Sequence, residues 1–295
     1  MSVPLLFAMP GNEAMTQRLV PLTRGDVGTL QVRNFPDRET YLRFRDKLSG
    51  RSVALVCTLA DPDPKILPLL FAADTARELG AVKVGLVAPY LAYMRQDRRF
   101  HPGEAITSQR FAAILSQSLD WLVTIDPHLH RYKSLAELYS IPTRVLHSGT
   151  TLSKWIVEKV PNPFIVGPDE ESEQWVAEIA RESGAPYSVL HKRRLEDERV
   201  EIDVGHLGPI GNKTPILVDD IISSGGTMLE AIRKLAELVR IPPVCLAVHG
   251  IFANHSDQLL VDAGARLVTT DSIENPHAEI GIAPLLASAI SEFVS

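Results

Sequence analysis

Apolar runs rich in β-branched residues recur along the chain, and segments with helical periodicity separate most of them. The runs cover residues 52–57, 82–89, 121–126, 163–169, 186–192, 215–220, 243–250 and 266–271. Continuous apolar strands that alternate with amphipathic helices are typical of parallel sheets covered on both faces. The sequence therefore predicts an α/β fold, doubly wound, in which each domain is a mainly parallel sheet covered by helices.

The length of 295 residues suits two domains of ordinary size. A new alternation of strands and helices starts near residue 147, in YSIPTRVLHSGTTLSKWI. We expect an N-terminal domain over 1–146 and a C-terminal domain over 147–281. The amphipathic segment 282–295 could pack on either half, and we assign it to the N-terminal domain.

Composition excludes several classes of protein. The chain is 45% hydrophobic and 22% charged, as in ordinary globular proteins, and its formal net charge is −6. That charge argues against a protein that coats nucleic acid. No apolar run reaches the roughly 18 residues that a membrane span needs, and the N-terminus lacks the basic region of a signal peptide. We expect a cytoplasmic protein with no membrane or nucleic-acid partner.

Polar side chains follow four of the predicted strands. These clusters are 126-DPHLHR-131, 169-DEESE-173, 192-KRR-194 and 219-DDIISSGGT-227. Ligands of open α/β sheets bind outside the carboxyl ends of the strands. Four strands that end in this way indicate a binding site.

The segment LVDDIISSGGTM (217–228) is the most informative of these clusters. A loop of serine, glycine and threonine before a helix presents backbone N–H groups to an anion at the positive end of the helix dipole. The preceding Asp219 and Asp220 could accept hydrogen bonds from two neighbouring sugar hydroxyls, or hold a cation. A phosphate beside a diol describes a 5-phosphoribosyl group, and the alternative is a plain strand-to-helix turn.

The same segment resembles the phosphoribosyl-diphosphate (PRPP) loop of type I phosphoribosyltransferases and PRPP synthetases. The rest of the chain resembles PRPP synthetases (ribose-phosphate diphosphokinases). The further motifs, in the family's order, are NFPDRE (34–39), APYLAYMRQDRRF (88–100) with GEAITSQRFAAIL (103–115), TIDPH (124–128), GPD (167–169), HKRR (191–194) and HGIF (249–252). This resemblance implies two phosphoribosyltransferase-like domains.

The resemblance also implies an activity and a site. The expected reaction is a Mg²⁺-dependent transfer of the diphosphoryl group of ATP to the C1 hydroxyl of ribose 5-phosphate, which yields PRPP and AMP. The implied residues are Lys192 and Arg194 for catalysis, Phe35, Asp37, Glu39, Arg95 and Gln96 for ATP, Asp219, Asp220, Ser223, Ser224, Gly225, Gly226 and Thr227 for ribose 5-phosphate, and His128 and Asp169 for the metal. The family pattern ranks His130 below His128. The loop around Phe35 reaches a neighbouring subunit in the family, so a homo-oligomer is implied, either a dimer or a hexamer of dimers.

Three features depart from the family pattern. Ser223 and Ser224 stand where an Asp-Thr pair is usual, Arg38 replaces a glycine, and an acidic turn after Asp169 replaces small residues. Extra carboxylates beside a phosphate or metal site change its electrostatics. Two alternative functions therefore remain: a silent or altered regulatory subunit with this fold, and a phosphoribosyltransferase that consumes PRPP.

Overall fold

The structure is a computed structural model that describes residues 3–195, 199–203 and 210–294. For Glu171, Gln174 and the two stretches 191–195 and 199–203, it describes the backbone alone. The chain divides into two compact units. The first comprises residues 1–146 and 282–295, and the second comprises residues 147–281.

The first unit is built on a six-stranded parallel sheet with the strand order β2-β1-β5-β6-β7-β8. Its strands are β1 (Leu5–Ala8), β2 (Asp26–Val27), β5 (Ser52–Val56), β6 (Lys83–Ala88), β7 (Trp121–Ile125) and β8 (Thr143–Leu146). A separate antiparallel hairpin pairs β3 (Leu30–Asn34) with β4 (Thr40–Phe44). The central strands β5 and β7 are buried along their whole length, which is why they read as continuous apolar runs.

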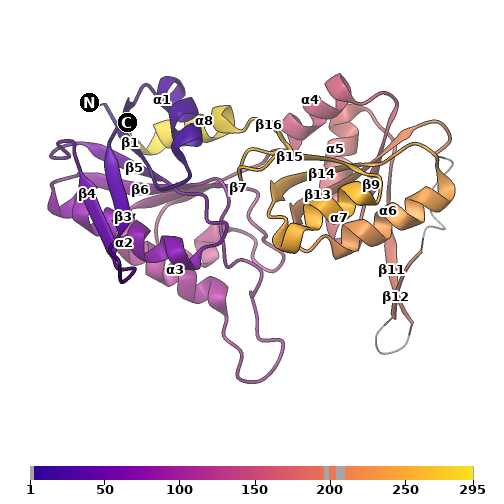
Figure 1. The fold of residues 1–295 in the computed structure, drawn as a ribbon, viewed down its shortest axis with the longest axis horizontal. Coiled ribbons are helices and arrows are strands. Elements are labelled where there is room, and N and C mark those ends of the chain that lie inside the picture. Colours follow the sequence, from indigo (N-terminus) through magenta and orange to yellow (C-terminus); the bar gives the residue numbers. More distant parts are fainter. Residues whose placement is uncertain (1–2, 196–198, 204–209, 295) are drawn as a thin grey trace. The chain divides into compact units, whose positions relative to one another are not determined.

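Helices cover both faces of this sheet. They are α1 (Glu13–Thr23), α2 (Asp63–Glu78), α3 (Thr107–Ser118), the 3-10 turn η1 (Leu135–Glu137) and the C-terminal α8 (Ala283–Val294). Helices α1 and α8 lie side by side on one face, and α2 and α3 lie on the other (Figure 1). Phe293 of α8 stacks on Trp121 of β7 with ring centroids 5.0 Å apart. The last helix of the chain is therefore part of the first unit.

The second unit repeats this architecture. Its parallel sheet has the order β10-β9-β13-β14-β15-β16. The strands are β9 (Pro163–Gly167), β10 (Tyr187–Val189), β13 (Thr214–Ile222), β14 (Val244–Gly250), β15 (Arg266–Thr270) and β16 (Ala278–Ile280). The hairpin of β11 (His191–Leu195) and β12 (Arg199–Asp203) stands apart from the sheet (Figure 1).

Helices of the second unit also pack in two pairs. One pair is α4 (Gly149–Lys159) with α5 (Glu173–Ser183), and the other is α6 (Gly226–Leu238) with α7 (Ser256–Asp262). The short 3-10 turns are η2 (Glu170–Ser172) and η3 (Ala253–His255). Buried side chains of β9, β13, β14 and β15 form one core cluster with those of α6 and α7. The buried residues of α6, from Met228 to Leu235, therefore pack in one core with those of β13 and β14.

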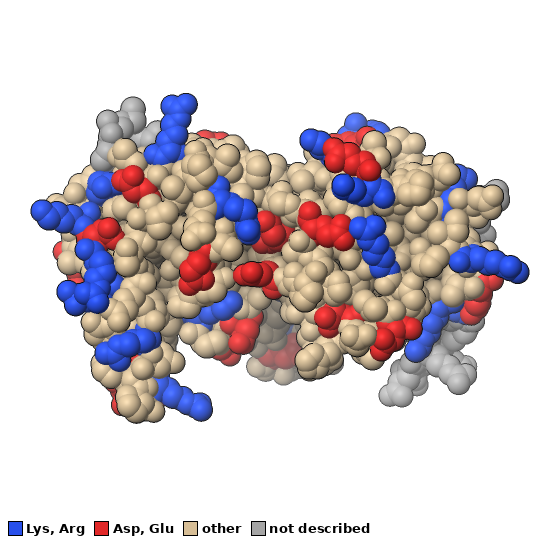
Figure 2. All heavy atoms as spheres, turned by 45° about the horizontal axis from the view of Figure 1, so that its top comes forward, with Lys and Arg blue, Asp and Glu red and all other residues tan. Residues whose placement is uncertain are grey.

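The predicted fold class is confirmed: both sheets are parallel and covered by helices. One predicted strand is wrong in extent, because 186–192 divides into β10, which ends at Val189, and β11, which belongs to the separate hairpin. None of the described helices is long and apolar enough to cross a membrane. On the face drawn in Figure 2, basic and acidic side chains are interspersed.

Candidate phosphoribosyl and metal-binding site

A three-residue connection, Ser223 to Gly225, joins β13 to α6 in the second unit. Gly225 is the residue before the helix and has φ of +73°, which glycine adopts without steric cost. Gly226 and Thr227, predicted to lie in the loop, form the first turn of α6. No side chain caps this helix with a hydrogen bond, so its first N–H groups are oriented to receive an anion.

The two predicted acids, Asp219 and Asp220, lie within β13, which continues for two residues beyond them. The backbone N–H of Asp220 donates to Oδ1 of Asp219 over 2.9 Å. Burial raises the pKa of the Asp219 carboxyl well above its ordinary value, and the charges of Asp220 and Asp169 raise this pKa further. The carboxyl groups of Asp219, Asp220 and Asp169 are therefore close enough to influence one another's charge.

Asp169 follows β9, the strand that pairs directly with β13. Its backbone carbonyl accepts hydrogen bonds from the hydroxyl (2.6 Å) and the N–H (3.2 Å) of Ser172, so the acidic turn is folded as η2. Asp169, Asp219 and Asp220 thus bring three carboxyl groups together at adjoining strands. Carboxylate oxygen is the ligand that Mg²⁺ prefers, and this acidic cluster fits a divalent cation.

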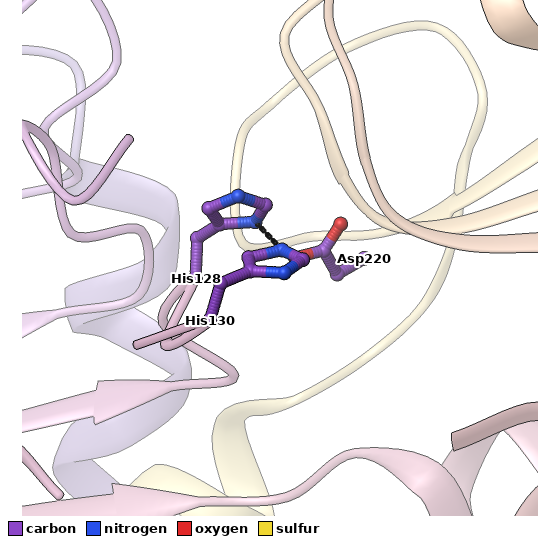
Figure 3. A group of neighbouring side chains, drawn as sticks. All are labelled: His128, His130 and Asp220. Carbon is purple, nitrogen blue, oxygen red and sulfur yellow. Dashed lines mark hydrogen bonds between the residues drawn. The ribbon is translucent and has the colours of Figure 1, made fainter. Parts of the chain in front are cut away.

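His128, the other predicted metal residue, lies in the first unit after β7 and contacts His130 (Figure 3). Nε2 of His130 lies 3.1 Å from Nδ1 of His128, and the ring centroids are 3.7 Å apart. His128 is half-buried and His130 is exposed. The family pattern ranked His130 as the weaker candidate, whereas the structure joins the two imidazoles in one pair. Asp220, also drawn in Figure 3, belongs to the second unit.

The segment that contains Arg95 and Gln96 is a loop that makes hydrogen bonds to other parts of the first unit. Tyr93 has φ of +61° and its hydroxyl donates to a carboxylate oxygen of Asp63 on α2. This hydrogen bond, followed by burial and the charge of Asp63, raises the pKa of Tyr93 to about 12. The carbonyl of Gln96 accepts from the N–H of Ser108 at 3.3 Å. Tyr93 and Asp63 were not among the residues predicted to bind ATP.

Phe35 sits at the turn of the β3–β4 hairpin and is 41% exposed. Its N–H donates to the carbonyl of Glu39 at 2.8 Å, and its ring meets the ring of Tyr41 edge-on at 5.9 Å. The guanidinium of Arg33 lies 4.8 Å from the Phe35 ring centroid and 4.1 Å from that of Tyr41. The ring of Phe35 is therefore supported from the side and open to solvent.

The same turn contains Asp37, which was predicted to bind ATP, and Arg38, which departs from the family pattern. Asp37 is exposed, and its Oδ1 accepts from the N–H of Glu39 at 3.1 Å. Arg38 has φ of +75°. The arginine thus occupies a left-handed conformation that a glycine would adopt freely, and the turn is formed despite the substitution.

The predicted catalytic residues Lys192 and Arg194 lie in β11, opposite Ile202 and Val200 of β12. Their side chains, and all of residues 196–198 and 204–209, lie outside the described part of the chain. Their catalytic roles stay predictions.

Comparisons with known proteins agree with this architecture. Residues 5–118 match the N-terminal domain of ribose phosphate pyrophosphokinase, and residues 134–285 match the phosphoribosyl transferase domain. The chain superposes on a phosphoribosylpyrophosphate synthetase from Mycobacterium smegmatis with a TM-score of 0.85, covering 99% of both chains at 24% sequence identity. The fold is therefore that of a two-domain protein of the phosphoribosyltransferase type.

Proteins similar in sequence define the family more closely than the fold does. The chain is 32% identical to a ribose-phosphate pyrophosphokinase of Methanopyrus kandleri over 93% of this chain and 94% of that protein. It is 33% identical to the one of Saccharolobus solfataricus over 81% and 82% of the two chains. The chain belongs to the ribose-phosphate pyrophosphokinase family.

Proposed function

We propose that this protein is a ribose-phosphate diphosphokinase. The observation that carries the proposal is in the second unit, where Asp219 and Asp220 lie near the end of β13 and the loop after that strand leads into an uncapped helix start, in a chain of this family. Helix N–H groups suit the 5-phosphate, and carboxylates suit the ring hydroxyls or their cation. In this role the loop from Ser223 to Thr227 binds the 5-phosphate of ribose 5-phosphate, and the two aspartates bind the sugar.

In the proposed reaction, the C1 hydroxyl oxygen of ribose 5-phosphate attacks the β-phosphorus of ATP. A new O–P bond forms, the bond from the β-phosphorus to the α,β-bridging oxygen breaks, AMP leaves, and the hydroxyl proton is lost. Such transfers depend on positioning and on stabilising the charge of the phosphoryl oxygens. Lys192 and Arg194 would provide that positive charge from the β11–β12 hairpin.

ATP would be held by residues of the first unit. Phe35 offers an exposed ring for the adenine, and Asp37 and Glu39 offer acceptors for its amino group. Arg95 and Gln96 would contact the phosphates and base. Asp169 and His128 would hold Mg²⁺, which, when bound, neutralises charge on the transferring phosphates. A homo-oligomer is part of this proposal, since an exposed hairpin ring can serve the ATP site of a second copy.

An assay with purified protein tests the proposal. We expect AMP and PRPP, in equal amounts, from ATP, ribose 5-phosphate and Mg²⁺, and neither product when the metal is chelated. The Lys192→Ala variant should lose about 10²-fold or more of this rate. Lys154→Ala, on the exposed side of α4, is the matched control and should keep it.

Two results would contradict the proposal. Absence of AMP above the level of Lys192→Ala, with folded protein, would favour a silent regulatory subunit. Release of diphosphate from supplied PRPP, dependent on a nucleobase, would favour a phosphoribosyltransferase.

A further inference from the structure

The segment that follows β14 holds the phosphate loop by its backbone carbonyls. The carbonyl of Ile222 accepts hydrogen bonds from the N–H groups of Ile251 (2.9 Å) and Phe252 (3.1 Å). The carbonyl of Ser223 accepts from the N–H of Ala253 (3.0 Å) and from the hydroxyl of Ser256 (2.6 Å). A carbonyl oxygen has two lone pairs, so both oxygens are fully used by residues 251–256.

These bonds determine which way the loop's N–H groups point. In a planar trans peptide, the N–H points opposite to the C=O of the same peptide unit. The carbonyls of Ile222 and Ser223 both face residues 251–256, so the N–H groups of Ser223 and Ser224 face away from that segment. This orientation turns two consecutive donors outward at the start of α6, where an anion is favoured.

The segment that makes these bonds is strained. Phe252, Asn254 and His255 have φ values of +50°, +55° and +58°. Left-handed φ is rare for residues other than glycine, and a bulky residue such as phenylalanine is an outlier there. Conformations of this kind persist where the surrounding structure over-determines them, and they gather at ligand sites.

Ser256 is the one side chain among these four donors. It is 1% exposed and is the first residue of α7. It also borders Gly225, because a Cβ at Gly225 would lie 3.1 Å from Cβ of Ser256 and 3.5 Å from Cδ1 of Leu260. Ser256 therefore acts on both sides of the loop: its hydroxyl holds the Ser223 carbonyl and its Cβ packs beneath Gly225.

We propose that Ser256 is a positioning residue for the sugar phosphate, since its hydroxyl fixes the Ser223–Ser224 peptide with the N–H toward the 5-phosphate. The inference rests on the proposed function of the loop and deepens it. Without this hydroxyl, the Ser223 carbonyl loses one of these two hydrogen bonds and keeps the one from Ala253, so the peptide gains freedom to rotate away from the anion-binding orientation.

The test is the binding of ribose 5-phosphate to full-length Ser256→Ala protein by calorimetry, together with the KM of each substrate. We expect the Kd and KM for ribose 5-phosphate to rise about 3- to 10-fold, as for loss of one hydrogen bond, with the KM for ATP unchanged. Ser256→Cys, which fills the same space with a weaker donor, should also weaken binding, and it serves if the alanine variant does not fold.

Ser153→Ala is the matched control. Ser153 is 3% exposed in the same unit, and its hydroxyl donates to the carbonyl of Gly149 at 2.8 Å, within α4. The Ser153→Ala variant should lose as much thermal stability as Ser256→Ala does, and its binding of ribose 5-phosphate should be unaltered. Equal binding by wild-type and Ser256→Ala proteins, or equal rises in both KM values, would overturn the proposal.

This outcome is distinct from failure of the proposed function. If wild-type protein binds ribose 5-phosphate and forms AMP, while Ser256→Ala binds equally well, the role of Ser256 alone is wrong. If wild-type protein does not bind ribose 5-phosphate, the proposed function and the role of Ser256 both fall.

Discussion

The backbone N–H of Asp220 donates to the carboxylate of Asp219 over 2.9 Å, inside a strand where both acids are partly buried. A single N–H donor does not offset the burial and the neighbouring negative charges, so the pKa of Asp219 is raised. Natural proteins tolerate such strain at functional sites and compensate for it elsewhere. The pair is therefore expected to lower the stability of the protein in the absence of ligand.

Replacement of Asp219 by asparagine should stabilise the protein at neutral pH. Because the folded pKa lies above the ordinary 3.8, the folded state binds the proton more tightly, and wild-type stability falls as pH rises above that value. We expect the melting temperature of Asp219→Asn to exceed that of wild type by on the order of 2–4 °C at pH 7.5. This difference in melting temperature should shrink as the pH falls toward 4. Thermal unfolding without substrates measures it.

The control for this prediction is Asp262→Asn, the same substitution at the exposed end of α7 and outside the cluster of Asp169, Asp219 and Asp220; it should raise the melting temperature less than Asp219→Asn does at pH 7.5. A difference in melting temperature between Asp219→Asn and wild type that is absent at pH 7.5, or that widens as pH falls, would contradict the argument.

Ribose 5-phosphate binding by Asp219→Asn should be lost or weakened at least 10-fold, since a hydrogen bond to a charged group is removed.

Alanine at Gly225 should impair the binding of ribose 5-phosphate. The residue has φ of +73°, and a Cβ would press on Ser256 at 3.1 Å. Gly184, the residue after α5, has φ of +67° with no atom within 4 Å of a Cβ. Both substitutions should cost about 1 kcal/mol from the backbone, measured by denaturation. Gly225→Ala alone should raise the Kd for ribose 5-phosphate, and equal Kd values for the two variants would refute a steric role for Gly225.

Local patterns in the sequence predicted eight of the twelve strands of the two parallel sheets, because buried strands such as β5 and β14 are continuous apolar runs. The short strands β1, β2, β8 and β16 were not among these runs, and α6 includes Gly226 and Thr227, which were expected in the loop. The acids of β13 and the loop after it could be predicted because they are contiguous. Contacts between distant residues could not: Tyr93 and Asp63 are 30 positions apart, and no local periodicity encodes their hydrogen bond.

Two other features were missed for related reasons. Strand β11 follows β10 after a single residue in sequence, but it pairs with β12, and pairing depends on the partner rather than on propensity. The left-handed residues at 252, 254 and 255 carry no glycine to indicate them. Hydrogen bonds from Phe252, Ala253 and Ser256 to the carbonyls of Ile222 and Ser223 hold this segment at the end of β13.

Loss of the Tyr93 hydroxyl should affect ATP more than ribose 5-phosphate. Tyr93 lies two residues before Arg95 and has a left-handed backbone. Its hydroxyl bonds to Asp63, and its ring packs on Phe111 with ring centroids 4.8 Å apart; these two contacts hold the conformation. Tyr93→Phe keeps the packing and removes the bond. We expect the KM for ATP to rise about 3- to 10-fold, measured by AMP formation, with the KM for ribose 5-phosphate unchanged. Tyr187→Phe, on exposed β10, is the control, and equal effects of the two variants would refute the role.

The exposed ring of Phe35 should contribute stacking energy to the nucleotide. Base stacking on an aromatic side chain is worth about 1–3 kcal/mol, so Phe35→Ala should raise the KM for ATP by roughly 5- to 100-fold. Phe35→Tyr keeps a ring beside Arg33 and Tyr41 and should stay near wild type. Phe71→Ala removes a ring of similar exposure, 47% against 41%, from α2 and should leave the KM for ATP unaltered. Because the ring is supported edge-on by Tyr41 at 5.9 Å, a wild-type KM in Phe35→Ala would mean that this support serves the hairpin and not the adenine.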